Sequence, residues 1–132
     1  MISNYLANNL LAHVFGDTPY SPPATFYVAL FTTMPNADGS GGVEVSGGSY
    51  ARAASTNDVS NWPDASSRVK ANAIDITFVQ ASAEWGSVVG AGIYDALSSG
   101  NLLVFGEFSN PIEVHLNGVV SFTPNQFTAT VS

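Results

Sequence analysis

The chain has 132 residues, of which 45% are hydrophobic and only 10% are charged, and three Lys and Arg residues against ten Asp and Glu residues give a formal net charge of −7. So few cations exclude direct nucleic-acid binding, which depends on clustered Lys and Arg side chains. The absence of cysteine excludes disulfides, thiolate nucleophiles and zinc–thiolate sites. A chain of this length forms one domain, and we expect that domain to span residues 1–132.

The one helix that the sequence indicates covers residues 3–15. Ser3 is a suitable N-cap, and Gly16 stands where a left-handed C-terminal cap is expected. The helix carries an apolar stripe made of Leu6, Leu10, Leu11, Val14 and Phe15. A helix this short is marginal in isolation, so the stripe needs a packing partner.

The sequence leaves two roles open for this helix. The stripe fits a helix that plugs one end of a β domain, and it equally fits an arm that docks on another subunit. Leu6 and Leu10 are therefore candidate interface residues.

A strand over residues 26–31 carries apolar side chains on both faces. Successive side chains alternate across a strand, so every second one from Phe26 onward points to one side. Tyr27, Ala29 and Phe31 point to the other side. Such a strand must be covered twice, by a second sheet and by a helix or a neighbouring subunit. We therefore expect Tyr27 and Phe31 to lie at an interface between subunits.

A loop rich in Gly, Ser and Asp follows at residues 34–42 and is expected to be flexible and exposed. It is no phosphate-binding loop, because Val43 and Glu44 follow its last glycine where Lys and Ser or Thr are required. Four oxygen-bearing side chains are spaced along this segment: Asn36, Asp38, Ser40 and Glu44. Their spacing does not match an EF-hand, so we expect an ordinary hairpin loop without a bound metal.

The rest of the chain alternates short apolar strands with turn signals. Further strands are expected at residues 73–79, 88–94, 102–108, 112–116, 119–123 and 127–131. In the first of these, Ile74, Ile76 and Phe78 point inward. Asn117-Gly118 predicts a two-residue type I′ hairpin. The pattern predicts a mainly β fold, an antiparallel, jelly-roll-like β-sandwich from about residue 24 to residue 131 with one N-terminal α-helix.

No arrangement of side chains predicts catalysis, so we expect no enzyme, no catalytic residue and no cofactor. His13 and His115 fall on different elements and lack a second His, a Cys or a carboxylate at metal-ligand spacing. No Ser lies in a Gly-x-Ser-x-Gly motif, and nothing pairs any two carboxylates as a glycosidase requires.

Two tryptophans and one arginine are expected at different depths. Trp62 lies in a polar stretch, which favours a surface or interface position and leaves glycan binding as a lesser alternative. Trp85 precedes a Gly-rich strand and is expected to cap the core where glycines allow close approach. Arg52 fits either a pair with a carboxylate at the core edge or a contact with a partner.

Several short segments occur in one order and at compatible spacings: residues 3–6, 10–15, 23–25, 30–33, 44–52 (EVSGGSYAR), 83–86 (AEWG), 93–95 and 100–103. Together they resemble a family of small bacteriophage virion proteins described as capsid-decoration (cement) or tail-fibre proteins. Residues 53–70 carry no signature of that family. The resemblance implies a structural part of a tailed-phage particle, assembled in the bacterial cytoplasm, and implies no catalytic residues.

The resemblance leaves the place in the particle open. Our main expectation is a capsid cement protein that forms homo-oligomers on the shell and stabilises it, with copies of itself and the major capsid protein as partners. The alternative is a tail or tail-fibre component that contacts other tail proteins and binds the host surface, including its glycans. No membrane partner is expected, because no run of about 18 apolar residues and no basic secretory signal region occurs.

Overall fold

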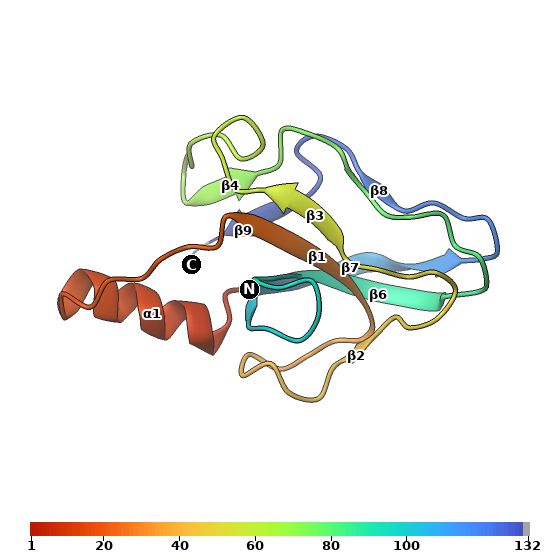
Figure 1. The fold of residues 1–132 in the computed structure, drawn as a ribbon, viewed down its shortest axis with the longest axis horizontal. Helices are drawn as coiled ribbons and strands as arrows, with labels where there is room; N and C mark the ends of the chain where they lie inside the picture. The colour runs from red at the N-terminus through yellow and green to blue at the C-terminus, as the bar shows by residue number, and fades with distance from the viewer. Residues whose placement is uncertain (131–132) are drawn as a thin grey trace.

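One helix precedes nine strands in the computed structural model, which describes residues 1–130 (Figure 1). The elements are α1 (Asn4–Phe15), β1 (Thr25–Thr33), β2 (Val43–Glu44), β3 (Ala53–Thr56), β4 (Val69–Ala71), β5 (Ile76–Thr77), β6 (Gly86–Tyr94), β7 (Leu102–Val114), β8 (Ser121–Phe122) and β9 (Thr128–Thr130). The strand pairs among these residues are antiparallel and form no closed barrel. The predicted mainly β fold with one N-terminal helix is confirmed.

The main sheet has the order β2–β1–β6–β7, and β3 pairs with β1 beside β2. Its longest strand, β7, merges the two strands predicted at residues 102–108 and 112–116. The backbone before α1 continues the sheet along β7, because the Phe105 N–H donates to the Met1 carbonyl at 2.9 Å and the Ser3 N–H donates to the Leu103 carbonyl at 2.8 Å. This pairing fixes the start of α1 to the edge of the sheet.

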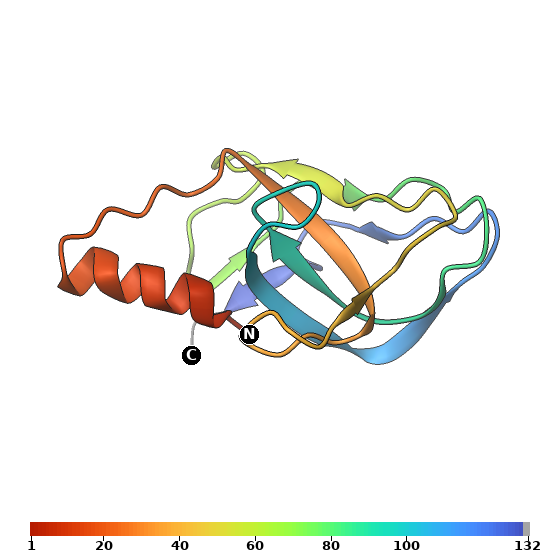
Figure 2. The ribbon, with the colours of Figure 1, turned by 60° about the horizontal axis from the view of Figure 1, so that its bottom comes forward.

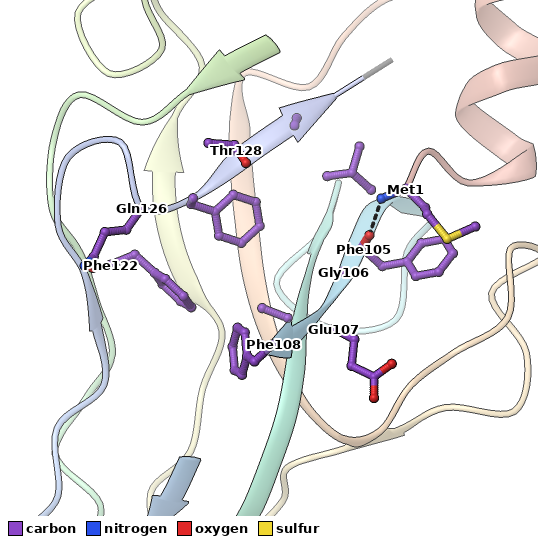
Figure 3. A pocket seen from close by; sticks show the side chains of 12 residues that line it. Met1, Phe105, Gly106, Glu107, Phe108, Phe122, Gln126 and Thr128 are labelled. Carbon is purple, nitrogen blue, oxygen red and sulfur yellow. Dashed lines mark hydrogen bonds between the residues drawn. The ribbon is translucent and has the colours of Figure 1, made fainter. Parts of the chain in front are cut away.

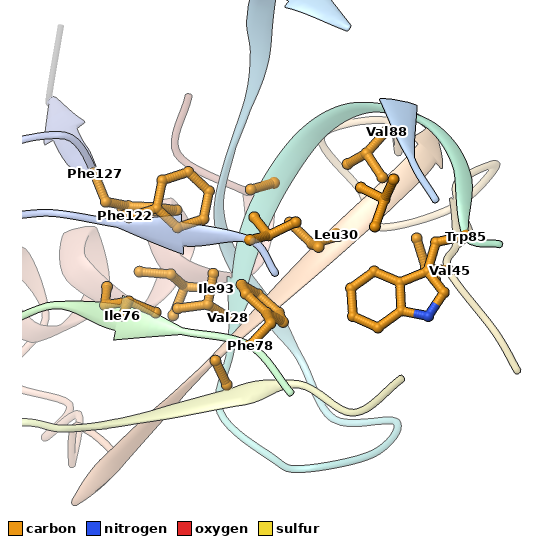
Figure 4. Close-up of a cluster of buried hydrophobic side chains, with 14 of the residues drawn as sticks. Val28, Leu30, Val45, Ile76, Phe78, Trp85, Val88, Ile93, Phe122 and Phe127 are labelled. Carbon is orange, nitrogen blue, oxygen red and sulfur yellow. The ribbon is translucent and has the colours of Figure 1, made fainter. Parts of the chain in front are cut away.

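A second layer is made by two short ribbons, β5–β8 and β4–β9, which pack over one face of the main sheet. The side chains between the layers form the larger core (Figure 4). Its labelled members are Val28, Leu30, Val45, Ile76, Phe78, Trp85, Val88, Ile93, Phe122 and Phe127. This two-layer arrangement agrees with the predicted sandwich.

The other face of β1 is covered by the chain itself, which corrects the expectation of an intersubunit cover. Phe31 is only 1% exposed, and it forms a second buried cluster with Ala29, Leu102 and Phe105. Met34 and Ala37, from the loop that was expected to be flexible, pack against this cluster together with Tyr94. Both faces of the strand are therefore buried within one chain.

Two glycines of β6 make room for this second cluster. A Cβ atom on Gly90 would lie 2.3 Å from the Met34 sulfur, and one on Gly92 would lie 2.9 Å from Cε2 of Phe31. The Gly-rich strand therefore serves close packing of side chains on the sheet, as a glycine in a strand interior often does.

Helix α1 extends beyond the end of the sandwich in both views (Figures 1 and 2). The predicted N-cap is confirmed, since the Ser3 hydroxyl accepts from the Leu6 N–H at 3.1 Å. The predicted left-handed cap at Gly16 is wrong: its φ is −163°, and the following Asp17 adopts the positive φ of 52°. None of the residues of α1 is buried.

The hairpin predicted at Asn117-Gly118 does not form. The Gly118 N–H donates to the His115 carbonyl at 2.9 Å, so the turn covers residues 115–118, and Asn117 takes a positive φ of 69° while Gly118 does not. The chain after the turn pairs with β5 through bonds such as Phe78 N–H to the Val120 carbonyl at 2.9 Å. The burial of Phe78 and Val120 in the core favours this distant pairing over a local hairpin.

Several strands are shorter than predicted, including β8, which covers only Ser121–Phe122 of the strand expected at residues 119–123. The segment expected to be a strand at residues 73–79 is paired as β5 only at Ile76–Thr77, and Ile74 is 53% exposed where an inward position was expected. The last strand, β9, covers Thr128–Thr130, and the predicted end of that strand at Val131 lies outside the described residues.

Asn72 joins the two ribbons of the second layer. Its side chain is 1% exposed, and its amide nitrogen lies 3.0–3.2 Å from the carbonyl oxygens of Ile74, Phe122 and Thr123. Its Oδ1 accepts from the Phe127 N–H at 2.9 Å. The Asn72 amide therefore provides hydrogen bonds to backbone groups of both ribbons, which are not paired with each other as strands.

We predict that Asn72→Ala lowers the free energy of unfolding by about 2–4 kcal/mol, because several buried backbone groups lose their partner. Urea unfolding of Asn72→Ala, compared with Asn8→Ala on the exposed surface of α1, measures the effect. An unchanged midpoint for Asn72→Ala would contradict the role given to this amide.

Candidate functional site

The most polar cluster of the structure surrounds Arg52, which is 6% exposed in its side chain. Its Nη2 and Nε donate to the two Glu44 carboxylate oxygens at 2.9 Å and 3.0 Å. Its Nη1 donates to the carbonyls of Ala96 and Ser99, both at 2.8 Å, and the guanidinium lies 3.7 Å above the Tyr94 ring. Of the two roles left open for Arg52, the structure shows the pair with a carboxylate at the core edge.

Tyr50 links this ion pair to the core. Its hydroxyl donates to Glu44 at 2.6 Å and accepts from the Leu30 N–H at 3.0 Å. Burial raises the pKa of Tyr50, and the hydrogen bond to the Glu44 carboxylate raises it further. Trp85 packs edge-on against Tyr50 and donates its ring N–H to the Gly48 carbonyl at 2.9 Å. Trp85 is buried, which confirms its predicted place in the core.

Two of the segments that carry the sequence resemblance, residues 44–52 and 83–86, thus meet in one framework of Glu44, Tyr50, Arg52 and Trp85. Each polar group in it already has a protein partner, and no buried side-chain N or O atom of the described residues lacks one. The framework therefore holds loops in place and has no free group for chemistry.

The described residues show no metal site. Asn36, Asp38 and Ser40 are hydrogen-bonded to one another, whereas Glu44 is paired with Arg52, so the four side chains considered from the sequence do not form one ligand set. Within residues 1–130, no group of three or more His, Cys, Asp or Glu side chains could hold a metal ion. The same residues contain no helix long and apolar enough to span a membrane.

The two histidines do not lie together. His115 pairs with Glu84 at an exposed position, and His13 accepts the Tyr20 N–H at 3.2 Å through Nδ1. A hollow of about 210 Å³ between β7 and β9 contains Glu107 as its one carboxylate, and that side chain points away from Phe108 (Figure 3). The hollow contains no histidine, and the His115–Glu84 pair does not line it.

An apolar groove of about 510 Å³ lies between α1 and the sandwich. We call it the α1 groove. Its lining residues are Leu6, Leu10, His13, Tyr20, Pro22, Phe26, Asn57, Trp62, Lys70, Ile93, Leu103, Val104 and Ala129. It therefore joins the helix, the Pro-rich connection, the main sheet and the β4–β9 ribbon at one place.

Trp62 forms part of the wall of the groove from within the core. It is 3% exposed, donates its ring N–H to the Ser55 hydroxyl at 3.0 Å and meets the rings of Phe26 and Phe127 edge-on. The predicted surface position of Trp62 is therefore wrong, because the polar stretch around it folds back over the sandwich. A buried indole offers no face on which a sugar could stack.

Helix α1 leaves most of its apolar stripe outside the groove. Leu11 is 58% exposed, Val14 65% and Phe15 82%, and the helix contains no Asp, Glu, Lys or Arg. Such a run of exposed apolar residues on one element marks a surface for a partner.

The structure brings three of the five predicted interface residues together and separates the other two. Leu6, Leu10 and Trp62 line the α1 groove. Tyr27 and Phe31 point to the opposite face of β1, where Phe31 is buried. Sequence reasoning missed the contributions of other segments to the groove, for which the sequence holds no local signal: Tyr20, Phe26, Lys70, Val104 and Ala129.

We predict that Glu44→Gln lowers the free energy of unfolding by about 1–3 kcal/mol, because Arg52 then keeps a largely buried charge without its counter-ion. Glu107→Gln, at an exposed position of β7, is the matched control. Equal unfolding midpoints in urea for the two variants would contradict the framework.

We further predict a pH dependence that resides in Tyr50. Its pKa is raised in the folded state, so its contribution to stability is complete below pH about 10 and is lost as the pH rises above the pKa of the unfolded chain. Urea unfolding at pH 9 and pH 11 is expected to show a larger loss for the wild-type protein than for Tyr50→Phe. Identical losses would show that Tyr50 ionises normally.

Residues 1–130 match the model of the family described as "Podophage GP4 fiber I protein gp80". No match was found among curated proteins. The family match supports the tail-fibre alternative and not our main expectation of a capsid cement protein. The chain belongs to the podophage GP4 fiber I protein gp80 family, a family of phage fibre proteins.

Proposed function

We propose that the protein is a non-enzymatic structural subunit of the fibre and that α1, together with the α1 groove, attaches it to its neighbour. The observation that carries this proposal is the exposed apolar stripe of α1, a helix without a buried residue. The sandwich supports the helix only at its first turns, where Leu6 packs against the larger core.

Burial of apolar side chains favours an arrangement in which a partner covers α1. Isolated helices of this length are marginal in water and gain most of their stability from packing of their apolar face. Removing one Leu, Val or Phe side chain from water contributes about 1.5–3 kcal/mol. Three largely exposed side chains, Leu11, Val14 and Phe15, thus offer several kcal/mol to an assembly that covers them.

The partners in this proposal are copies of the chain or other tail proteins of the same particle. The framework around Arg52 supports the structural role, because its polar groups bind one another and hold the loops of the sandwich in place. Glycan binding through Trp62 is not part of the proposal, because the indole is buried.

We predict that Leu11→Ser reduces the amount of the protein in purified particles several-fold, because it removes apolar contact from the attachment surface. Leu116→Ser is the matched control: Leu116 is 59% exposed, against 58% for Leu11, and lies in the turn at the far end of the sandwich. Quantitative mass spectrometry of particles from phage carrying each variant measures incorporation. Full incorporation of Leu11→Ser, or equal loss of both variants, would contradict the proposal.

A further inference from the structure

We infer that the neighbour held by α1 is a second copy of this chain, bound so that the two α1 helices lie antiparallel about a two-fold axis near Leu10. This inference rests on the proposed role of α1 as the attachment element and adds the identity and orientation of the partner.

The spacing of the apolar stripe allows α1 to pair with an antiparallel copy of itself. Leu6 and Val14 lie four residues before and four residues after Leu10. An antiparallel copy therefore places its Val14 opposite Leu6 and its Leu10 opposite Leu10. A two-fold interface requires such a self-complementary patch, and rows of residues spaced by four are the ridges that pack most often between helices.

The distribution of charge also favours contact between two copies through α1. The chain carries a net charge of −7, so two copies repel each other over most of their surfaces. Helix α1 contains no Asp, Glu, Lys or Arg, so two copies of it meet without a contact between like charges. This face is thus the place where two acidic copies meet with the least repulsion.

The shape of the surface around the stripe also favours a second copy as the partner. Leu6 and Leu10 face the α1 groove, which is lined mainly by apolar side chains of α1, the Pro-rich connection, β1, β6, β7 and β9, together with Trp62. The exposed end of the helix, Val14 and Phe15, has no cover in its own chain. In the antiparallel pair, Val14 and Phe15 of one copy lie over the first turns of α1 in the other copy, next to its α1 groove. Each copy therefore covers the exposed helix end of the other.

Single-cysteine variants of the purified protein test this arrangement, because the chain has no cysteine of its own. Leu10→Cys is expected to form a disulfide-linked dimer under mild oxidation, since each Leu10 meets its own copy at the axis. A mixture of Leu6→Cys with a differently tagged Val14→Cys is expected to give the mixed dimer. Neither variant is expected to cross-link alone, because eight residues of helix separate the two copies of either thiol by about 12 Å, beyond the reach of a disulfide.

Leu116→Cys, at the other end of the sandwich, is the control for random collision. Cross-linking of Leu6→Cys with itself would show a parallel pair and overturn the inference, as would equal cross-linking of Leu116→Cys. Circular dichroism of each variant verifies folding, and Leu10→Cys, which is tested alone, keeps the arrangement testable if Leu6→Cys fails to fold.

Sedimentation equilibrium gives an independent measurement. Leu10→Ser is expected to raise the dimer dissociation constant about 100-fold or more, since each substitution acts twice across a two-fold interface. A wild-type protein that stays monomeric and uncross-linked while Leu11→Ser still lowers incorporation into particles would overturn the second copy as partner. That result would leave attachment through α1 standing and assign it to another tail protein.

Discussion

Strand β1 is buried on both faces by its own chain, and the rest of the structure depends on this double cover. One face packs against the β5–β8 and β4–β9 ribbons, and the other packs under the loop that contains Met34 and Ala37. Gly90 and Gly92 create the space that the second cluster needs. The sandwich thus covers β1 by itself, whereas α1 carries the largest group of exposed apolar side chains on one described element: Tyr5, Leu10, Leu11, Val14 and Phe15.

The framework around Arg52 explains why the family resemblance is visible in sequence and yet carries no chemistry. Glu44, Tyr50 and Trp85 hold distant loops against the sheet through an ion pair, hydrogen bonds and ring contacts. Residues of this kind are constrained by geometry, because the loss of one partner leaves another polar group buried and unpaired. The family in which these segments occur is one of fibre proteins, and a rigid scaffold that presents an attachment helix suits a fibre subunit.

Features that depend on neighbours in the sequence could be predicted, and features that depend on distant segments could not. The Ser3 cap and the alternation along β1 follow from local geometry, and both were predicted. The cover of Phe31 comes from a Gly-rich loop whose composition indicates mobility, and the burial of Trp62 depends on ring contacts with strands far away in the chain. The chain after the turn at residues 115–118 pairs with β5 and not with the strand just before it, and this pairing brings together the core residues Phe78 and Val120.

We infer that the sandwich folds by itself and that α1 gains its stability from a neighbouring subunit. Hydrogen exchange of the backbone amides, measured on dilute protein and on assembled fibres, separates the stability of the two parts. We expect slow exchange of β1 and β6 in both samples, and exchange of residues 7–15 that is fast in the dilute protein and slow in the fibre. Equal protection of α1 in both samples would show that the helix needs no neighbour.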